Sequence, residues 1–411
     1  MKKVLILSRN GTCYLDYRII SQAVFLKNSG FDVIVIEANK IYSERNKLYE
    51  EKGIPVIEAY QIAPKIEGLL KLLGLGKIMQ KHFTEIRPKI KREALRLLGL
   101  RKIIVSIERK STNNITLQKL NIIKPNFIIT RDLLDSGVIA YKAKNPEVKI
   151  IADLHEVLFF QHGYLDKKLQ NLQDKELKHA SYIINVTPQI AETYYKHFLD
   201  EGRTIIIPNA PSLALTPSKK PGFIQNKQIK FLCHGFYKKN RDIKLINFIK
   251  DFVQYSPNHF VLYLRFDNKN IAMEALKVYY QNTKAKERIF FLNPVQGIYN
   301  EIESMIDNYD IGISFLHTEL GGQYTMSSPN RFGTYTHAGL AILTNESLFM
   351  GEIVKEKNLG FIVKENNFKE VIEFIANNPE KVLECKQNAY KFAKESFNYE
   401  FFGKEIVKLL K

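Results

Sequence analysis

The residues from Ser328 to Arg331 combine the groups that a protein uses to bind a phosphate. Ser328 is a good N-cap for the helix that follows, and Pro329 suits the first helical position, where a missing N–H costs nothing. Free backbone N–H groups and the positive end of the helix dipole attract anions at such a start. Asn330 and Arg331 lie just inside it, so the segment is suited to holding a diphosphate. The alternative is an ordinary capped helix with a solvated Arg331.

A second polar cluster follows a short apolar run, 149–152, which reads as a buried strand. Asp153, His155 and Glu156 come directly after it. In open α/β sheets ligands bind at the carboxyl ends of strands, so these side chains are candidates for a reaction site. As a general base, Glu156 would have to lie within hydrogen-bond reach of the hydroxyl that it deprotonates. The alternative is that the cluster makes structural hydrogen bonds in a crossover loop.

A third cluster opens the second half of the chain. The apolar run 229–233 predicts a strand, which leads through Gly235 into a basic stretch that includes Arg241. A helix over 242–252 follows, with Lys244 in its first turn. A strand, a glycine and a basic cluster at a helix start are typical of a phosphate-facing loop. A basic solvated loop is the alternative.

The elements around these clusters alternate between strands and helices. A strand over 4–8, the turn at Asn10 and Gly11, a helix over 17–28 and a strand over 32–37 form a βαβ unit, which implies a parallel sheet. The same rhythm resumes after residue 112 and continues to residue 363. Prolines 208, 211, 217 and 221 mark a linker without periodicity.

Chain length and net charge further limit the class of protein. The chain has 411 residues, enough for two domains, and carries a net charge of +18. Residues 62–110 hold thirteen Lys or Arg and four Asp or Glu, a net charge of +9. They read as two basic amphipathic helices, which either contact an anionic membrane surface or pack on a domain with solvated lysines. Nucleic-acid binding is disfavoured because aromatic RNA-binding signatures and zinc-finger spacings are absent.

The three cysteines, Cys13, Cys233 and Cys385, lie far apart and form no disulfide or metal-binding spacing. A reducing cytoplasm is the simplest interpretation. No apolar run approaches the ~20 residues of a membrane span. We expect a cytoplasmic protein, with a peripheral position at the inner face of the plasma membrane as the further option that the basic segment raises.

The segment that begins at Ser328 resembles the donor site of glycosyltransferase family 4 and its GT-B-fold relatives. The family often reads Ser-Pro-Asn-Lys, a hydrophobic residue, any residue, then Glu-Tyr, with a glycine four residues later. This chain differs at Thr334, where the family has the Glu that usually holds the nucleotide ribose, and at Ala341, where it often has Pro. The matching positions are Ser328, Pro329, Asn330, Arg331, Phe332, Tyr335 and Gly339.

This resemblance implies an α/β fold of two Rossmann-like, doubly wound parallel-sheet domains facing a cleft, called GT-B. The expected parts are an N-terminal acceptor-side domain at 1–210 with a basic insertion at 62–114, a linker at 211–228, a nucleotide-sugar domain at 229–395 and a final helix at 396–411 that crosses back. The implied catalytic residues are His155, Glu156 and Arg331. The implied acceptor-side residues are Gly11 and Asp153. The implied donor-binding residues are Gly235, Arg241, Lys244, Glu319, Ser327, Ser328, Asn330, Arg331 and Thr334.

The implied function is transfer of a sugar from a nucleotide-sugar donor to a glycan or lipid-linked acceptor in bacterial surface polysaccharide synthesis. No Asp-x-Asp run and no metal-ligand spacing is present, so basic residues would take the role of a metal ion. We expect no cofactor and a retaining reaction. The alternative is a non-catalytic GT-B subunit that binds nucleotide or glycan and supports a partner. Thr334 is the residue that favours this alternative.

Overall fold

The computed structural model describes residues 1–8, 17–37, 49–58, 116–132, 134, 136–160, 164–223, 228–235, 243–266, 287–295, 297–364 and 367–411. Three parts of the sequence-based prediction lie outside these residues: the basic insertion at 62–114, Gly11 and Arg241. Within the described residues, no helix is both long enough and apolar enough to cross a membrane.

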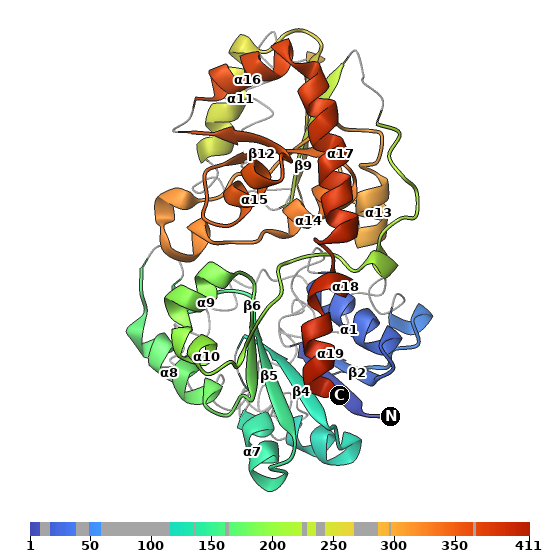
Figure 1. Cartoon of the computed structure of the whole chain (residues 1–411), viewed down its shortest axis with the longest axis vertical. Helices are drawn as coiled ribbons and strands as arrows, with labels where there is room; N and C mark the ends of the chain where they lie inside the picture. The colour runs from blue at the N-terminus through green and yellow to red at the C-terminus, as the bar shows by residue number, and fades with distance from the viewer. Residues whose placement is uncertain are drawn as a thin grey trace, which may run out of the picture. The chain divides into compact units, whose positions relative to one another are not determined.

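The first sheet has seven strands in the order β3-β2-β1-β4-β5-β6-β7 (Figure 1). In its centre Ile6 pairs in parallel with Val35 on one side and Ile129 on the other. The run from Val4 to Leu7 is at most 2% exposed, as a strand buried on both faces requires. The strands are β1 (Lys3–Ser8), β2 (Asp32–Glu37), β3 (Val56–Glu58), β4 (Phe127–Arg131), β5 (Lys149–Leu154), β6 (Tyr182–Asn185) and β7 (Thr204–Ile206).

Helices alternate with these strands. The helices in this part of the chain are α1 (Arg18–Asn28), α7 (Ser136–Lys144), α8 (Lys167–Leu177), α9 (Pro188–Tyr194) and α10 (Lys196–Asp200), and residues 116–123 are also helical. The sequence predicts a single helix over 188–199, but the helix ends at Tyr194 and a second one begins at Lys196. Tyr195 takes a non-helical conformation there, and its buried hydroxyl donates to Gln173 Oε1 at 3.1 Å. The break between α9 and α10 coincides with this tertiary contact.

The second sheet has six parallel strands in the order β10-β9-β8-β11-β12-β13. Its strands are β8 (Ile229–Gly235), β9 (Phe260–Phe266), β10 (Ile289–Leu292), β11 (Ile311–Ile313), β12 (Ala341–Asn345) and β13 (Gly360–Val363). Its helices are α11 (Ile243–Tyr255), α13 (Ile298–Glu303), α14 (Asn330–His337), α15 (Met350–Glu356), α16 (Phe368–Asn377), α17 (Pro379–Glu395), α18 (Tyr399–Phe402) and α19 (Lys404–Leu410). Short 3₁₀ turns lie at Leu213–Leu215, Thr318–Leu320 and Gly322–Thr325.

An aromatic core holds α11 against this second sheet. The ring of Phe231 on β8 lies 5.4 Å from Phe252 on α11 and 5.4 Å from Phe260 on β9. All three side chains are fully buried. Burying one such side chain contributes about 1.5–3 kcal/mol, so this cluster is a major source of the stability of the sheet. The long helix α17 packs along α14 and β12 (Figure 1).

The described residues form two compact units. One contains segments from 1–11, 31–152 and 175–181, and the other contains segments from 12–30, 153–174 and 182–411. The domain and linker boundaries expected from the sequence remain predictions.

Helix α14, which carries the Ser-Pro-Asn-Arg motif, differs from its prediction at the start. Pro329 is the N-cap, in extended conformation and without a side-chain cap, and the helix begins at Asn330. The prediction that Ser328 caps this helix is therefore wrong, because the Ser328 hydroxyl has another partner, described below. The sequence also predicts that Gly339 ends this helix as its C′ residue, and that prediction is confirmed. Gly339 has φ +71°, and the N–H of Leu340 donates to the carbonyl of Tyr335, as in a glycine-terminated helix.

Candidate functional site

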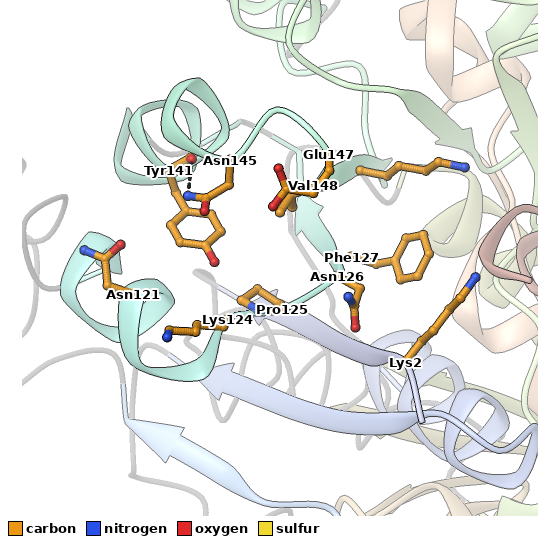
Figure 2. A pocket seen from close by; sticks show the side chains of 11 residues that line it. Lys2, Asn121, Lys124, Pro125, Asn126, Phe127, Tyr141, Asn145, Glu147 and Val148 are labelled. Carbon is orange, nitrogen blue, oxygen red and sulfur yellow. Dashed lines mark hydrogen bonds between the residues drawn. The ribbon is translucent and has the colours of Figure 1, made fainter.

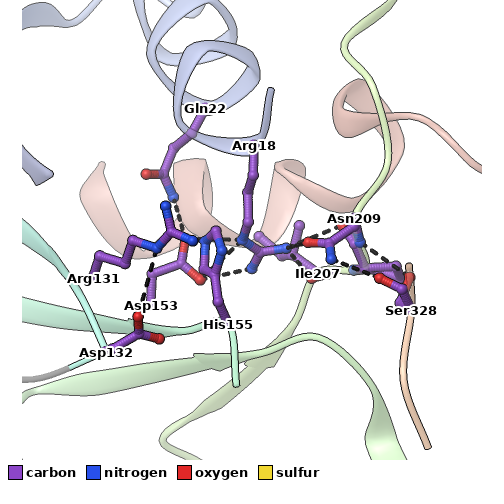
Figure 3. Close-up of polar contacts among 10 residues, drawn as sticks. Arg18, Gln22, Arg131, Asp132, Asp153, His155, Ile207, Asn209 and Ser328 are labelled. Atoms are coloured by element: carbon purple, nitrogen blue, oxygen red, sulfur yellow. Dashed lines mark hydrogen bonds and ion pairs between the residues drawn. The ribbon is translucent and has the colours of Figure 1, made fainter. Parts of the chain in front are cut away.

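A buried ion pair connects the start of α1 with the end of β5 (Figure 3). Arg18 Nη2 lies 2.7 Å from Asp153 Oδ1, and Arg18 Nε donates to both carboxylate oxygens at 3.1 Å. The two side chains are 1% and 4% exposed. The Gln22 amide, one turn along α1, reaches Asp153 Oδ2 at 3.4 Å. The carboxylate predicted to face an acceptor is thus surrounded by donors from α1.

Charge sets the protonation state of this carboxylate. Burial alone raises the pKa of Asp153, but the Arg18 guanidinium and the His155 ring outweigh burial and hold that pKa well below its usual range. A carboxyl with a lowered pKa stabilises the folded state above its unfolded pKa of about 3.9 and loses that contribution as the pH falls below it.

Acid titration checks this linkage. The free energy of unfolding of the wild type should fall as the pH drops from 5 towards 2. In this range the Asp153 carboxyl takes up a proton in the unfolded chain but stays ionised in the folded protein. Asp153→Asn cannot titrate, so its stability should lie below that of the wild type near pH 7 and the gap should narrow with acid. Urea unfolding at stepped pH measures both curves. Parallel curves would contradict the linkage.

The same guanidinium also holds the segment that follows β7. Arg18 Nη1 donates to the carbonyl of Ile207 at 2.6 Å, to that of Pro208 at 3.1 Å and to Asn209 Oδ1 at 3.2 Å. An arginine fork can bind two sets of acceptors at once because its donors are fixed in one plane. Arg18 therefore links the end of β5 to residues 207–209.

Asn209 carries the connection on to the Ser-Pro-Asn-Arg motif (Figure 3). Its backbone N–H donates to Ser328 Oγ at 3.2 Å, and its amide donates to the Ser328 carbonyl at 2.6 Å. The Tyr17 hydroxyl lies 3.1 Å from the carbonyl of Asn209 and 2.7 Å from that of Asn330. Arg18 and Asn209 thus join two motifs that the sequence analysis identified separately.

The other two residues of the strand-end cluster differ in exposure. His155 Nε2 lies 3.7 Å from Asp153 Oδ2, and the ring is 7% exposed. Glu156 is exposed. His155 is therefore held against Asp153, whereas Glu156 faces solvent. Their predicted catalytic roles remain predictions.

Arg331 is half-buried in the first turn of α14. Among the described residues, no hydrogen bond or ion pair engages its guanidinium. A half-buried cation at a helix start without a side-chain cap is a strong local attractor for an anion.

Thr334, which stands where the family has Glu, faces the interior. It is 1% exposed, and its hydroxyl donates to the Arg331 carbonyl at 3.1 Å. Its Oγ1 also lies 3.1 Å from His234 Nε2, at the end of β8. The other nitrogen of that ring, Nδ1, is 2.7 Å from Glu301 Oε1 on α13. Thr334 is therefore a buried partner of His234 in this structure.

Two predicted donor-site residues, Lys244 on α11 and Glu319 in the segment after β11, form an ion pair. Lys244 Nζ lies 3.0 Å from Glu319 Oε2 and donates to Thr318 Oγ1 at 2.6 Å. Burial raises the pKa of Glu319, but its own backbone N–H, Lys244 and His317 outweigh burial and leave that pKa lowered. Lys244 is thus already neutralised by a carboxylate, which weakens its case as a diphosphate ligand.

The remaining predicted residues are placed as follows. Gly235 ends β8 with φ +108°, and a Cβ built on it would meet no atom of the described residues within 4 Å. A backbone of this kind favours glycine. The Ser327 hydroxyl donates to the Gln323 carbonyl at 2.7 Å. Among the described residues, no group of three His, Cys, Asp or Glu side chains could hold a metal ion.

Sequence reasoning missed Arg18, Asn209 and His234. The one signal for Arg18 was Gln22 four residues later, since two polar residues at that spacing share one face of a helix. In the sequence, Asn209 is marked only by its position after Pro208, at the end of a predicted strand. Nothing in the sequence pairs His234 with Thr334.

The two parallel sheets of seven and six strands, with flanking helices, give the chain the fold of the GT-B glycosyltransferases. No protein-family model and no curated protein sequence matches the chain. Among solved structures it resembles a glycosyltransferase from Rickettsia africae, with a TM-score of 0.64 and 12% identity over 99% of this chain and 97% of that one.

Two further structures show the same likeness. HepE from Anabaena in complex with UDP-glucose has a TM-score of 0.64 and 12% identity over 100% of this chain and 99% of that one. Sucrose-phosphate synthase from Thermosynechococcus elongatus has a TM-score of 0.64 and 13% identity over 100% and 98%. At these identities the comparisons establish the fold.

Proposed function

We propose that this protein is a glycosyltransferase that moves a sugar from a nucleotide-sugar donor to an acceptor. The observation that carries the proposal is the half-buried Arg331 at the start of α14, which has no ion-pair partner in the described part of the chain. Its motif is joined through Asn209 and Arg18 to Asp153 and His155. The fold supports it, since solved structures of this architecture include HepE bound to UDP-glucose.

The chemistry that this arrangement offers is stabilisation of a leaving diphosphate. The bond between the sugar and the diphosphate breaks most readily where the departing charge is neutralised by fixed donors. One such preorganised donor is typically worth about 3–4 kcal/mol in the transition state. Arg331 and the backbone N–H groups at the start of α14 would supply it, while His155 and Glu156 would face the sugar and the acceptor.

The finer points of the proposal follow the resemblance. The acceptor would be a glycan or a lipid-linked saccharide in bacterial surface polysaccharide synthesis, and transfer would retain the anomeric configuration without a metal ion or a cofactor. The protein would act in the cytoplasm, at the inner face of the membrane if its basic segment at 62–110 binds anionic lipid.

A second candidate is a non-catalytic subunit that binds nucleotide or glycan and supports a partner enzyme. The burial of Thr334 against His234 favours it, because the position that holds the ribose in the family carries no exposed acceptor here. The two candidates differ in turnover, and only the glycosyltransferase requires a nucleotide-sugar site.

A thermal-shift panel of nucleoside diphosphates and nucleotide sugars tests the proposal. A ligand at 100 times its dissociation constant adds about 2.7 kcal/mol of stability, so one base should raise the melting temperature clearly above the others. The matching nucleoside without phosphates is the control and should give no shift. If no nucleotide shifts the transition, the donor site is refuted and a glycan-binding subunit becomes the better account.

A further inference from the structure

A pocket of about 570 Å³ lies in the first compact unit, away from the residues discussed so far (Figure 2). Lys2 precedes β1, Phe127 begins β4 and Lys149 begins β5, so the pocket opens at the amino-terminal ends of these strands. Ligands of open α/β sheets usually bind at the opposite, carboxyl-terminal ends. The pocket is therefore separate from the proposed transfer chemistry.

Charge gives the pocket a preference for anions. Its lining contains three lysines and one glutamate, a net charge of +2. Among the described residues, no ion pair or hydrogen bond engages the ammonium groups of Lys124 and Lys149. Lys2 Nζ lies 5.8 Å from the centre of the Phe127 ring. Lysine ammonium groups act as point charges for phosphate.

Amide side chains add directional hydrogen-bonding groups to the same wall. Asn126 Oδ1 accepts the backbone N–H of Lys3 at 2.8 Å, which leaves the Asn126 amide N–H groups to donate. The Asn145 amide donates to the Tyr141 carbonyl at 2.9 Å, which leaves its Oδ1 to accept (Figure 2). These two hydrogen bonds fix which end of each amide faces outward.

Tyr141 and Glu147 complete the polar wall. Burial and the Glu147 carboxylate raise the pKa of the Tyr141 hydroxyl, so this hydroxyl remains protonated as a donor. Glu147 is an acceptor that suits hydroxyl groups and repels additional phosphates. Pro125, Phe127 and Val148 supply buried apolar surface beside these groups.

We propose that this pocket binds a monophosphorylated sugar. The cavity is far larger than inorganic phosphate needs and falls within the roughly 300–1,000 Å³ of small-molecule sites. Lys149 would bind the phosphate at one end of the pocket. Lys124, the asparagine amides and Glu147 would bind ring hydroxyls, and the apolar surface would pack against the ring face. The single carboxylate disfavours nucleoside diphosphates, which carry more charge.

The backbone at Lys124 offers a variant that separates binding from folding. Lys124 follows the helical residues 116–123 with φ +49°, and its N–H donates to the Leu120 carbonyl at 2.9 Å. A left-handed conformation is strained for a residue with a Cβ, and glycine adopts it freely. Lys124→Gly therefore removes the ammonium group at a position where the backbone tolerates glycine.

Isothermal calorimetry on the full-length protein, with glucose 6-phosphate, glucose and inorganic phosphate as probes, tests the proposal. Glucose 6-phosphate should bind saturably, at least tenfold more tightly than either fragment. Lys124→Gly and Lys149→Glu should each weaken it at least tenfold. Lys144→Glu, an exposed lysine on α7 outside the pocket lining, should leave it unchanged. Absence of saturable binding, or binding that survives both pocket substitutions, would overturn the proposal.

The sugar phosphate could be free or carried on a lipid, and a second arm separates these sources. Ile122 is 81% exposed and adjoins Asn121 on the pocket wall. Flotation with phosphatidylcholine vesicles containing a polyprenyl-phosphate-linked glucose should show binding that Ile122→Ser weakens if the source is a lipid. Binding of free glucose 6-phosphate alone supports the soluble source. Nucleoside diphosphates should not compete in either arm, so failure here is distinct from failure of the proposed donor site.

Discussion

Asp153→Ala should lower the free energy of unfolding by about 3–5 kcal/mol, the usual cost of leaving one charge of a buried pair without its partner. Arg18 would keep its contacts to Ile207 and Pro208 but lose the carboxylate that neutralises it inside the protein. Urea unfolding near pH 7 measures the loss. His155 would also lose the carboxylate that lies 3.7 Å from its ring, so its position should change as well.

A double-mutant cycle separates the pair from its surroundings. Arg18→Met and Asp153→Leu together should cost clearly less than the sum of the two single changes, because neither charge is then left alone. The matched surface pair is Lys381 and Glu384, 2.7 Å apart and 47% and 44% exposed, whose coupling should stay within about 1 kcal/mol. A coupling for Arg18 and Asp153 no larger than that of the surface pair would refute this account.

The fold could be predicted from sequence wherever local signals agreed with burial. The sequence predicts a strand over 32–37, a helix over 136–144 and a strand over 289–292. These ranges coincide with those of β2, α7 and β10, since each is an apolar or periodic run bounded by turn residues. The strand β3, only three residues long, left too short a pattern to recognise. Within the final segment 396–411, the sequence predicts one helix over 399–410, but the structure divides it at Gly403, where a Cβ would lie 2.5 Å from the ring of Phe25.

The candidate site was predictable only in its parts. Ser328 and Arg331 are visible because a helix start has a local signature. The connection from Asp153 to Arg18 spans 135 residues, and that from Asn209 to Ser328 spans 119. A contact between distant residues depends on how strands are ordered in a sheet, and one sequence does not contain that order. Thr334 shows the same limit, since only the structure shows that His234 is its partner.

Arg331→Ala should reduce nucleotide-sugar turnover by about 10²–10³-fold, which corresponds to the loss of one preorganised donor to a developing negative charge. The fold should remain intact, because no described residue depends on the guanidinium for a hydrogen bond or ion pair. Steady-state kinetics with the nucleotide sugar chosen by the thermal-shift panel measures the change, and near-ultraviolet circular dichroism checks the fold.

Two further variants test whether a loss of turnover in Arg331→Ala is specific to the Arg331 guanidinium. Arg331→Lys keeps the charge but removes the planar fork. Its turnover should therefore lie between that of Arg331→Ala and that of the wild type. Arg203→Ala removes an arginine whose side chain is 30% exposed and paired with Glu201, and turnover should not change. If the wild type binds nucleotide but shows no turnover, the chain is a binding subunit, and Arg331→Ala should then weaken nucleotide affinity instead. Unchanged turnover and unchanged affinity in Arg331→Ala would exclude Arg331 from the site, and the donor would have to bind elsewhere.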